Sequence, residues 1–314
     1  LNYVFMLPGG GAMHLVDSLG KSNMPYICFL HEQAASIAAE SFGQHKNFPC
    51  VLLVTSGPGA TNAITGVTAA WIDSTPMVII SGQAKRSDLV GEKKVRQIGS
   101  QEVNIIQMVK HITKYAVQIL DPLKIRYHLE KAFYEATTGR KGPVWLDIPL
   151  DVQSAMMDVN DLESFEIPVS CMETDYVNNA VSKVLNRLNK AKRPLILAGN
   201  GVYTADAVED FYRLLEKIKV PVQTTWKSID LLWDNHPLYA GHPGILGDRG
   251  ANFILQECDL FLSLGARLDN SITAFNEEQF APNAYKIVVD IDENELNKFS
   301  MHINEKICCD VKDF

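Results

Sequence analysis

The sequence predicts an α/β protein made of two doubly wound parallel-sheet domains, and three observations carry this prediction. Short, nearly continuous apolar runs bounded by Gly and Pro alternate with helical patterns, as strands covered on both faces require. The alternation runs to about residue 150, stops at an acidic stretch, and then starts again. The length of 314 residues accommodates about two such domains.

The first half of the chain contains five predicted strands. They are "YVFML" from residue 3, "YICFL" from residue 26, "CVLLVT" from residue 50, "MVIIS" from residue 77 and "VWLDIP" from residue 144. Residues 33–42, 62–74 and 124–138 between them have helical patterns. All five runs are apolar enough to be buried strands of one parallel sheet.

An acidic stretch separates the two halves. Residues 151–175, "DVQSAMMDVNDLESFEIPVSCMETD", contain seven acidic residues and no Lys or Arg. Such a stretch is typical of a linker on the surface. We therefore predict a first domain at residues 1–155, a linker at 156–175 and a second domain at 176–314.

The second half repeats the alternation of helices and strands. Helices are predicted at residues 176–191, 205–218 and 252–256, and strands at 194–200, 220–225, 260–265 and 286–292. This order again predicts a doubly wound sheet.

Composition and charge narrow the class of protein. Hydrophobic residues make up 46% of the chain and charged residues 21%, which is ordinary for a globular protein. The formal charge of −8 argues against a nucleic-acid partner, because such surfaces are built from clustered Lys and Arg. No run approaches the roughly 18 apolar residues of a membrane span, and no basic leader precedes an apolar stretch. We therefore expect a cytoplasmic protein without a membrane partner.

The residue types that bind metals show no suitable spacing. The six cysteines form no Cys-x-x-Cys pair, and the histidines form no metal-like pattern. We therefore predict no metal ligands in this chain. The sequence begins with Leu, inside a predicted strand, so we expect it to be a piece of a longer protein.

Glu32 is an acid where the local pattern predicts none. It stands between the apolar run at 26–30 and an alanine-rich helical pattern. Partial burial would penalise the carboxylate there, whereas the free amide groups at the start of a helix would favour it. An acid in this position could give a proton to a ligand nitrogen. A glutamate that merely caps the helix explains the same pattern.

Two glycine-rich turns follow predicted strands. Residues 57–59, Gly-Pro-Gly, come after the run at 50–55, and Pro8, Gly9 and Gly10 come after the run at 3–7. Glycine permits a close approach of the backbone to an aromatic or anionic ligand. Glycine turns also simply connect strands to helices.

The motifs taken together resemble a known family. "PGGG", "HEQAASIAAE", "TSGPGATNAITGV", "DSTPMVIISGQ" and "GPVWLDIP" occur in the order found in the pyrimidine-binding domain of thiamine diphosphate enzymes, and most closely in the acetolactate (acetohydroxyacid) synthase branch. Residues 176–314 resemble the central domain of that branch through "AGNG", "GHPGILGDRGAN", "CDLFLSLGARLDNSITAF" and "VVDID".

The resemblance implies an activity and a cofactor site. It implies thiamine diphosphate-dependent decarboxylation of a 2-oxo acid such as pyruvate and ligation to a second carbonyl compound, as in branched-chain amino acid biosynthesis. In that family the acid matching Glu32 hydrogen-bonds the aminopyrimidine ring and favours its imino form. The positions that match the family's cofactor site are Pro8, Gly9, Gly10, His31, Ser56, Gly57, Pro58, Gly59 and Asn62.

Gln101 is the second residue that the resemblance places at the reacting centre. It lies in "RQIGSQEVNIIQMVKHITKY", where the family usually has an aromatic residue directly before the glutamine and this chain has Ser100. The departure leaves the choice of substrate open. Gln101 and the later Lys114 could equally be surface residues of a helix.

The resemblance also raises the question of FAD in the central domain. Matching positions are Gly199, Gly201, Gly244, Gly247, Gly265, Arg267 and Asp290. Leu246 and Ser271 stand where the branch often has His and Arg, and each replacement removes a donor that could hold the flavin. FAD is therefore one possibility for this domain, and glycine loops of this kind are common in any doubly wound fold.

The magnesium motif of the family does not occur in the sequence. Thiamine diphosphate enzymes hold Mg²⁺ through a Gly-Asp-Gly segment followed by Asn, and the chain contains no Gly-Asp-Gly. We expect that site in a C-terminal diphosphate-binding domain absent from this chain, so the isolated fragment should be inactive. Because the active centre of the family is shared between subunits, a homodimer or homotetramer is implied. A different thiamine diphosphate-dependent lyase or ligase, and a non-catalytic nucleotide-binding paralogue, stay open.

Overall fold

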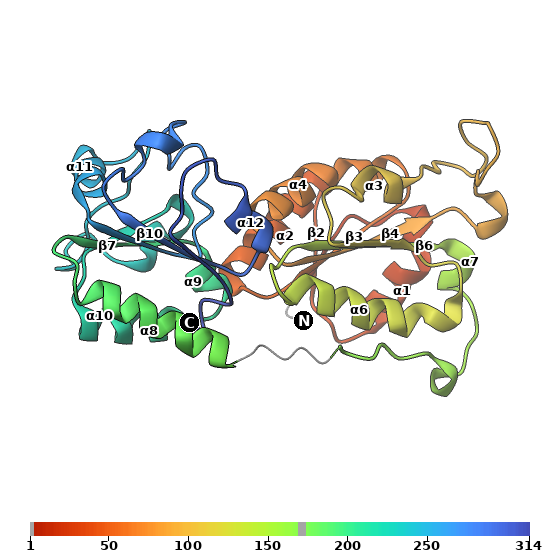
Figure 1. Cartoon of the computed structure of the whole chain (residues 1–314). Coiled ribbons are helices and arrows are strands. Elements are labelled where there is room, and N and C mark those ends of the chain that lie inside the picture. The colour runs from red at the N-terminus through yellow and green to blue at the C-terminus, as the bar shows by residue number, and fades with distance from the viewer. Residues whose placement is uncertain (1–2, 169–173) are drawn as a thin grey trace. The chain divides into compact units, whose positions relative to one another are not determined.

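A computed structural model describes residues 3–168 and 174–314, which form two compact units divided between residues 169 and 170. Each unit is a parallel sheet with helices on both faces, so the predicted fold class is confirmed. Figure 1 shows the two sheets and their helices.

The first unit contains a six-stranded sheet in the order β2-β1-β3-β4-β6-β5. Its strands are β1 (Val4–Met6), β2 (Tyr26–Cys28), β3 (Cys50–Val54), β4 (Met77–Gln83), β5 (Tyr115–Gln118) and β6 (Pro143–Pro149), and all pairs are parallel. Its helices are α1 (Met13–Lys21), α2 (Glu32–Lys46), α3 (Pro58–Asn62), α4 (Ile64–Asp73), α5 (Ile105–Val109), α6 (Ile125–Thr137) and α7 (Leu150–Gln153).

Alternate side chains of the central strands enter two separate cores. Leu52 of β3 packs in the core that contains Ala35 of α2 and Val67 of α4, and its neighbour Val51 packs in the core that contains Ala132 of α6. In Figure 1, α2, α3 and α4 accordingly lie on one face of the sheet, and α1 and α6 on the other. Apolar residues on both faces explain why the strands read as continuous apolar runs.

The predicted burial of the run at 26–30 is wrong. Tyr26 and Ile27 of β2 are 49% and 42% exposed, and Leu30 is fully exposed. The reason is topological, because β2 is an edge strand that pairs with β1 alone. The apolar character of this run therefore marks an exposed surface of the described chain.

Other differences from the predicted elements are local. The predicted helix at 62–74 is divided into α3 and α4, and α3 starts at Pro58. The sequence did not predict the helices α1, α5, α7, α9 (Gly201–Thr204) and α12 (Glu293–Asn297), nor the short edge strands β5 and β11 (Glu305–Cys308). Edge strands are covered on fewer sides, so their sequences carry a weaker apolar signal.

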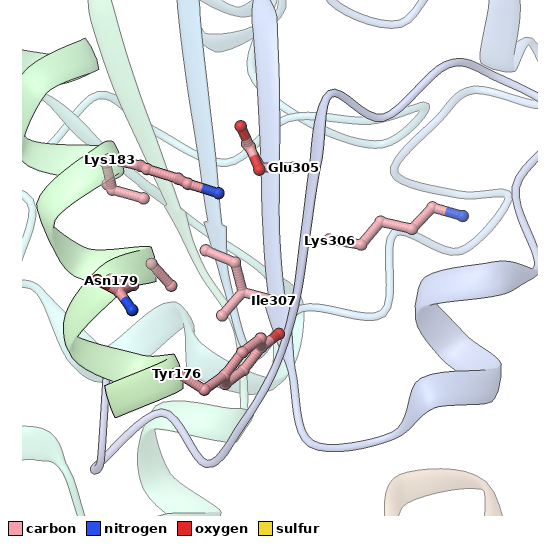
Figure 2. Close-up of a pocket in the computed structure, with 8 residues that line it drawn as sticks. Tyr176, Asn179, Lys183, Glu305, Lys306 and Ile307 are labelled. Carbon is pink, nitrogen blue, oxygen red and sulfur yellow. The ribbon is translucent and has the colours of Figure 1, made fainter. Parts of the chain in front are cut away.

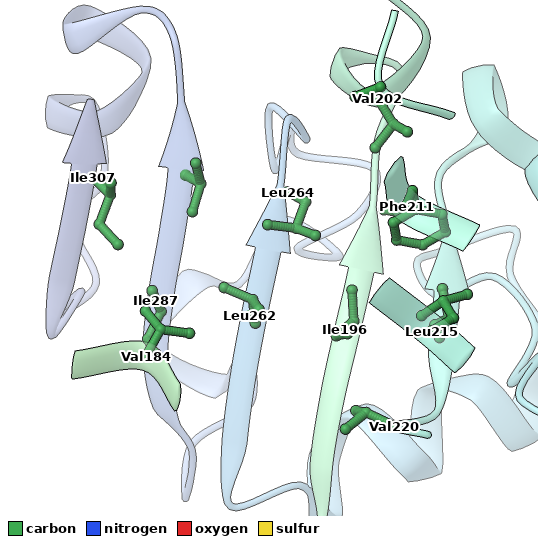
Figure 3. Packing of buried hydrophobic residues seen from close by; sticks show 14 of the residues in the cluster. Val184, Ile196, Val202, Phe211, Leu215, Val220, Leu262, Leu264, Ile287 and Ile307 are labelled. Carbon is green, nitrogen blue, oxygen red and sulfur yellow. The ribbon is translucent and has the colours of Figure 1, made fainter. Parts of the chain in front are cut away.

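The second unit contains a five-stranded parallel sheet in the order β11-β10-β9-β7-β8. The remaining strands are β7 (Pro194–Ala198), β8 (Val222–Thr224), β9 (Leu260–Leu264) and β10 (Tyr285–Asp290). The helices are α8 (Thr174–Leu188), α9 (Gly201–Thr204), α10 (Val208–Ile218), α11 (Arg249–Glu257) and α12 (Glu293–Asn297). Figure 3 shows one of its two cores, in which Ile196, Leu262 and Ile287 project from neighbouring strands toward the helices.

Residues 156–168 of the predicted linker belong to the first unit. The Phe165 amide donates to Glu130 Oε2 at 2.8 Å, and its ring contacts those of Tyr127 and Tyr134 on α6. Residues 169–173 of the linker lie outside the described residues, and α8 begins at Thr174. Across the described ranges, no helix has both the length and the apolar composition needed to cross a bilayer.

Candidate functional site

The sheet of the first unit reverses its direction of growth between β1 and β3. From β1 the chain adds β2 on one side, and β3 then pairs with β1 on the other side. In open parallel sheets, ligands bind at the carboxyl ends of the strands where this reversal occurs. The loops that follow β1 and β3 lie at this point, and they contain the two predicted glycine turns.

Glycines allow these two loops to touch. A Cβ atom on Gly9 would lie 2.5 Å from Thr55 Cβ, and one on Gly11 would lie 2.5 Å from Ser56 Oγ. The Gly11 amide also donates to Thr55 Oγ1 at 3.0 Å. A larger residue at position 9 or 11 would therefore separate the loops. Gly10 faces open space, and Pro8 is exposed beside it.

Glu32 is the first residue of α2, and its side chain is buried. It is 7% exposed, and Asn62 Nδ2 donates to its Oε2 at 3.0 Å. Its Oε1 faces Gly59: a Cβ atom added to Gly59 would lie 3.1 Å from this oxygen. The helix is capped by His31, whose Nδ1 accepts the Gln33 amide at 3.1 Å, so the cap is not Glu32. The acid is thus sheltered and oriented by a residue thirty positions away.

The chemistry open to Glu32 follows from this geometry. One carboxyl oxygen is fixed by the Asn62 amide, and the other lies beside Gly59, which has no side chain to cover it. A sheltered carboxyl group can exchange a proton with a ligand nitrogen without competition from bulk water. Within the described residues, no group of three or more His, Cys, Asp or Glu side chains could hold a metal ion.

The structure brings Gln101 to the same glycine turn. A Cβ on Gly57 would overlap the carbonyl oxygen of Gln101, and both residues have positive φ angles, +60° and +58°. Gln101 is an exposed surface residue, as the alternative held, but it lies in a turn and not on a helix. Ser56 is buried beside Gly11, and Pro58 opens α3. The turn at 56–59 is thus in contact with two other loops and with the first residue of α2.

Lys114 has a structural role away from these loops. Its ammonium group donates to the carbonyl oxygens of Glu135 and Thr138 at the end of α6. Burial lowers the pKa of Lys114, whereas the nearby Glu135 carboxylate opposes this shift. The residue therefore stabilises the negative end of a helix.

Asp147, the acid in the run "VWLDIP", lies inside the sheet. It lies within β6 with no exposed surface, because the strand continues to Pro149. Ser81 Oγ donates to its Oδ1 at 2.6 Å, and the side-chain amides of Gln83 and Gln118 donate to Oδ2 at 3.0 and 2.9 Å. Burial raises its pKa to about 6, although these three hydrogen bonds oppose the shift. In the sequence, a single acid within an apolar run was the one sign of this buried carboxyl group, as it was for Glu32.

The second unit has a comparable reversal between β7 and β9, where the predicted flavin positions gather. A Cβ on Gly199 would overlap the Gly265 carbonyl oxygen, and one on Gly201 would lie 2.5 Å from the Gly265 Cα. Similarly, Gly244 and Gly247 are packed against the protein's own backbone. These glycines are thus explained by contacts within the unit. Asp290 is buried at the end of β10, and its Oδ1 accepts the Asp292 amide.

Two buried polar atoms lie near this reversal without partners. Among the described residues, no hydrogen bond reaches Gln223 Oε1 or Thr224 Oγ1 at the end of β8. Ser271 is engaged with Asp269 Oδ1 at 2.5 Å, and Leu246 is 67% exposed. The unit therefore offers buried polar atoms, but neither replaced position supplies a flavin donor.

A separate groove of about 200 Å³ lies between α8 and β11. Figure 2 shows Tyr176, Asn179 and Lys183 from the helix facing Glu305 and Ile307 from the strand. It contains none of the predicted site residues. Nothing in the structure shows what covers this groove, so we assign it no role.

Comparisons with known proteins agree with the resemblance. The family model for the thiamine pyrophosphate (thiamine diphosphate) enzyme N-terminal TPP binding domain matches residues 1–108, and that for the central domain matches residues 181–314. A probable acetolactate synthase large subunit of Methanocaldococcus jannaschii is 36% identical over 301 residues, which cover 94% of this chain and 49% of the relative. Acetolactate synthase isozyme 2 large subunit of Escherichia coli is 35% identical over 298 residues, 95% and 52% of the two chains.

The large subunit of acetolactate synthase from Lactococcus lactis is 34% identical over 297 residues, 94% of this chain and 50% of the relative. The chain thus spans about half the length of the curated relatives that it matches. Both of its units match domains of one family, in the order expected from the motifs. The chain belongs to the thiamine pyrophosphate enzyme family.

Proposed function

We propose that this chain supplies the pyrimidine-binding and central domains of an acetolactate synthase-like enzyme. The enzyme would decarboxylate a 2-oxo acid such as pyruvate and join the product to a second carbonyl compound. The relatives named as acetolactate synthase large subunits support this proposal. The domain boundaries proposed with it are residues 1–155 and 176–314, and a diphosphate-binding domain would lie outside this chain.

The observation that carries the proposal is the sheltered carboxyl group of Glu32. The group is 7% exposed, receives the Asn62 amide on Oε2, and faces Gly59 with Oε1. Thiamine diphosphate, when bound, would supply the electron sink that decarboxylation of a 2-oxo acid requires. Glu32 would hold a proton shared with the pyrimidine ring, and Asn62 would keep the carboxyl group in the orientation for this exchange.

The surrounding loops would shape the pocket for the ring. Gly9, Gly57 and Gly59 let these loops pack closely on Thr55 and Gln101 beside Glu32, and the loops held in this way would border the ring. Gln101 would then contact the substrate from the opposite side of the Gly57 turn. The cofactor site would also depend on His31, Ser56 and Pro58, which fix the backbone at the start of α2 and in the turn before α3.

The test uses Glu32→Gln in the full-length protein with thiamine diphosphate and Mg²⁺. We expect loss of the measurable hydrogen–deuterium exchange at the reactive carbon of the cofactor, because the amide cannot exchange the proton. The matched control is Glu40→Gln, since Glu40 lies on the same helix with the same 7% exposure but accepts from Gln44 and Thr75. Wild-type exchange in the Glu32 variant would refute the role.

Two cofactor proposals extend beyond the thiamine site. We propose that Mg²⁺ binds in the diphosphate-binding domain outside this chain. FAD, or another nucleotide, is proposed for the reversal between β7 and β9, because ligands of open parallel sheets bind at such a reversal. The packing of Gly199, Gly201 and Gly265 on each other does not add support, because it explains these glycines without a ligand.

We also propose that the enzyme is a homodimer or homotetramer. Tyr26, Ile27 and Leu30 form an exposed apolar run directly before His31 and Glu32. Exposed apolar groups of this kind favour contact with another protein surface. A second subunit on this run would further shelter Glu32 from water.

A further inference from the structure

The loop of residues 84–103 carries Gln101 and is mostly exposed. It leaves the sheet at the end of β4, appears in orange in Figure 1, and returns to the unit before α5. Residues 91–98 are all exposed, and the loop contains Lys93, Lys94 and Arg96. A long exposed loop has many accessible conformations. The contact of Gln101 with Gly57 therefore requires anchors that fix the loop.

Gln83 joins the two ends of this loop. Its Oε1 accepts the Ala84 amide at 2.9 Å, where the loop begins, and its Nε2 donates to the Val103 carbonyl at 2.9 Å, where the loop ends. The same Nε2 donates to Asp147 Oδ2 at 3.0 Å. With 1% of its surface exposed, Gln83 has no competing hydrogen bonds from bulk water. One side-chain amide thus closes the base of the loop.

Asp147 fixes the orientation of that amide. An ionised carboxylate only accepts hydrogen bonds, so the NH₂ group of Gln83 must face it and the oxygen must face Ala84. The reversed amide would place its oxygen against Asp147 and the Val103 carbonyl, and would lose all three hydrogen bonds. Burial raises the Asp147 pKa to about 6, which leaves the group mainly ionised at neutral pH.

A second buried acid anchors the middle of the loop. Glu102, which directly follows Gln101, is 8% exposed. Its Oε1 accepts the Val90 amide at 2.5 Å, and its Oε2 accepts the amides of Ile98 and Gly99 at 3.3 and 3.4 Å. The carboxylate thereby folds residues 90–102 on themselves. Arg86 ties the start of the loop to Asp151 and to the Leu120 carbonyl, and Gln83 joins both ends of the loop to the sheet.

We propose that Gln83 and Asp147 are positioning residues of the active centre, which hold the 84–103 loop so that Gln101 stays in contact with Gly57. The inference deepens the proposed function and rests on it for the role of Gln101. Among the described residues, the hydrogen bonds of Gln83 and Asp147 do not reach Glu32 or Asn62, so both residues act through the loop.

The first part of the test measures the loop without any activity assay. Gln83→Met is compared with Gln118→Met, because each removes one amide from Asp147 Oδ2 and only Gln83 also binds the loop. Limited trypsin digestion of the full-length protein, read by mass spectrometry, gives the cleavage rate after Lys93, Lys94 and Arg96. We expect roughly a tenfold increase in Gln83→Met, which loses two hydrogen bonds to the loop, and less than a twofold change in Gln118→Met.

The second part measures catalysis with the same variants. We expect Gln83→Met to lower kcat by roughly tenfold, while the concentration of thiamine diphosphate for half-maximal activity changes less than twofold, because Glu32 and Asn62 are intact. Asp147→Asn is the conservative variant. Its oxygen can replace Oδ2 and its NH₂ can donate to Ser81, so we expect near-wild-type cleavage and kcat.

Several outcomes would overturn the positioning role. Equal cleavage rates in Gln83→Met and Gln118→Met would show that Gln83 does not hold the loop and that Asp147 only stabilises the sheet. Faster cleavage of the loop in Gln83→Met with an unchanged kcat would show that catalysis does not depend on the position of Gln101. Normal cofactor proton exchange in Glu32→Gln would instead refute the proposed function, whatever the cleavage rates show, so the two failures are distinguishable.

Discussion

Two buried acids of α2 differ in the partners that the fold gives them. Glu32 and Glu40 are equally exposed at 7%. Glu40 Oε1 accepts from Gln44 at 2.5 Å and from Thr75 at 3.0 Å, within the core of the unit. Glu32 lies instead at the helix start, where one oxygen faces a glycine turn. Burial alone therefore does not distinguish a structural acid from a candidate catalytic one, and the neighbouring groups do.

Gly57 allows a residue-scale prediction about the loop contact. Gly57→Ala combines a positive φ angle with overlap of the new Cβ and the Gln101 carbonyl oxygen, so we expect a loss of unfolding free energy of about 2 kcal/mol or more. Gly91→Ala is the control, because φ is +54° and no atom lies within 4 Å. It should cost only about 1 kcal/mol. Urea denaturation measures both, and equal costs would show that the Gly57 contact is not tight.

At the scale of elements, the site depends on the packing of α2 on α4. Gly66 of α4 lies against Ser36 of α2, and a Cβ there would be 2.5 Å from Ser36 Oγ and 2.6 Å from its carbonyl carbon. Small residues on both helices, such as Ala35 of α2 and Ala70 of α4, allow this close approach. Because α2 begins with Glu32, a shift of this helix would move the acid.

Gly66→Ala and Gly20→Ala should change stability in opposite directions. The Gly66 variant forces the two helices apart, and we expect a decrease in unfolding free energy of about 1–3 kcal/mol. Gly20 lies in α1 with no atom within 4 Å of a Cβ, so alanine there should raise it by up to about 1 kcal/mol through helix propensity. Thermal unfolding followed by circular dichroism would compare them. A neutral Gly66 variant would mean that the helix pair adjusts freely.

At the scale of the whole molecule, the exposed apolar run at 26–30 is one surface that the described chain leaves uncovered. β2 pairs with one strand only, and Leu30 has its entire side chain exposed. An edge strand with apolar side chains is a poor surface to leave in water. Coverage by a second subunit would explain why this run has the composition of a buried strand.

Leu30→Asp should therefore weaken self-association of the full-length protein. A charge placed in an apolar interface loses its hydration, so we expect a shift toward monomer in analytical ultracentrifugation, of roughly tenfold or more in the dissociation constant. Met156→Asp is the control, because Met156 is 98% exposed and lies in the predicted linker. Unchanged association of the Leu30 variant would place the subunit interface elsewhere.

The sequence by itself determined the two doubly wound units, because apolar runs and helical periods are local patterns that burial on both faces of a sheet imposes. It also indicated the two glycine turns of the first unit and marked Glu32 as an acid beside an apolar run. Only the tertiary structure decided that Asn62 holds Glu32, that Gln101 meets Gly57, and that Asp147 binds Gln83 inside the sheet. The strand order likewise decided that the run at 26–30 is exposed. The physical reason is that hydrogen bonds and steric contacts between residues distant in the chain depend on the order of the strands, which no local pattern records.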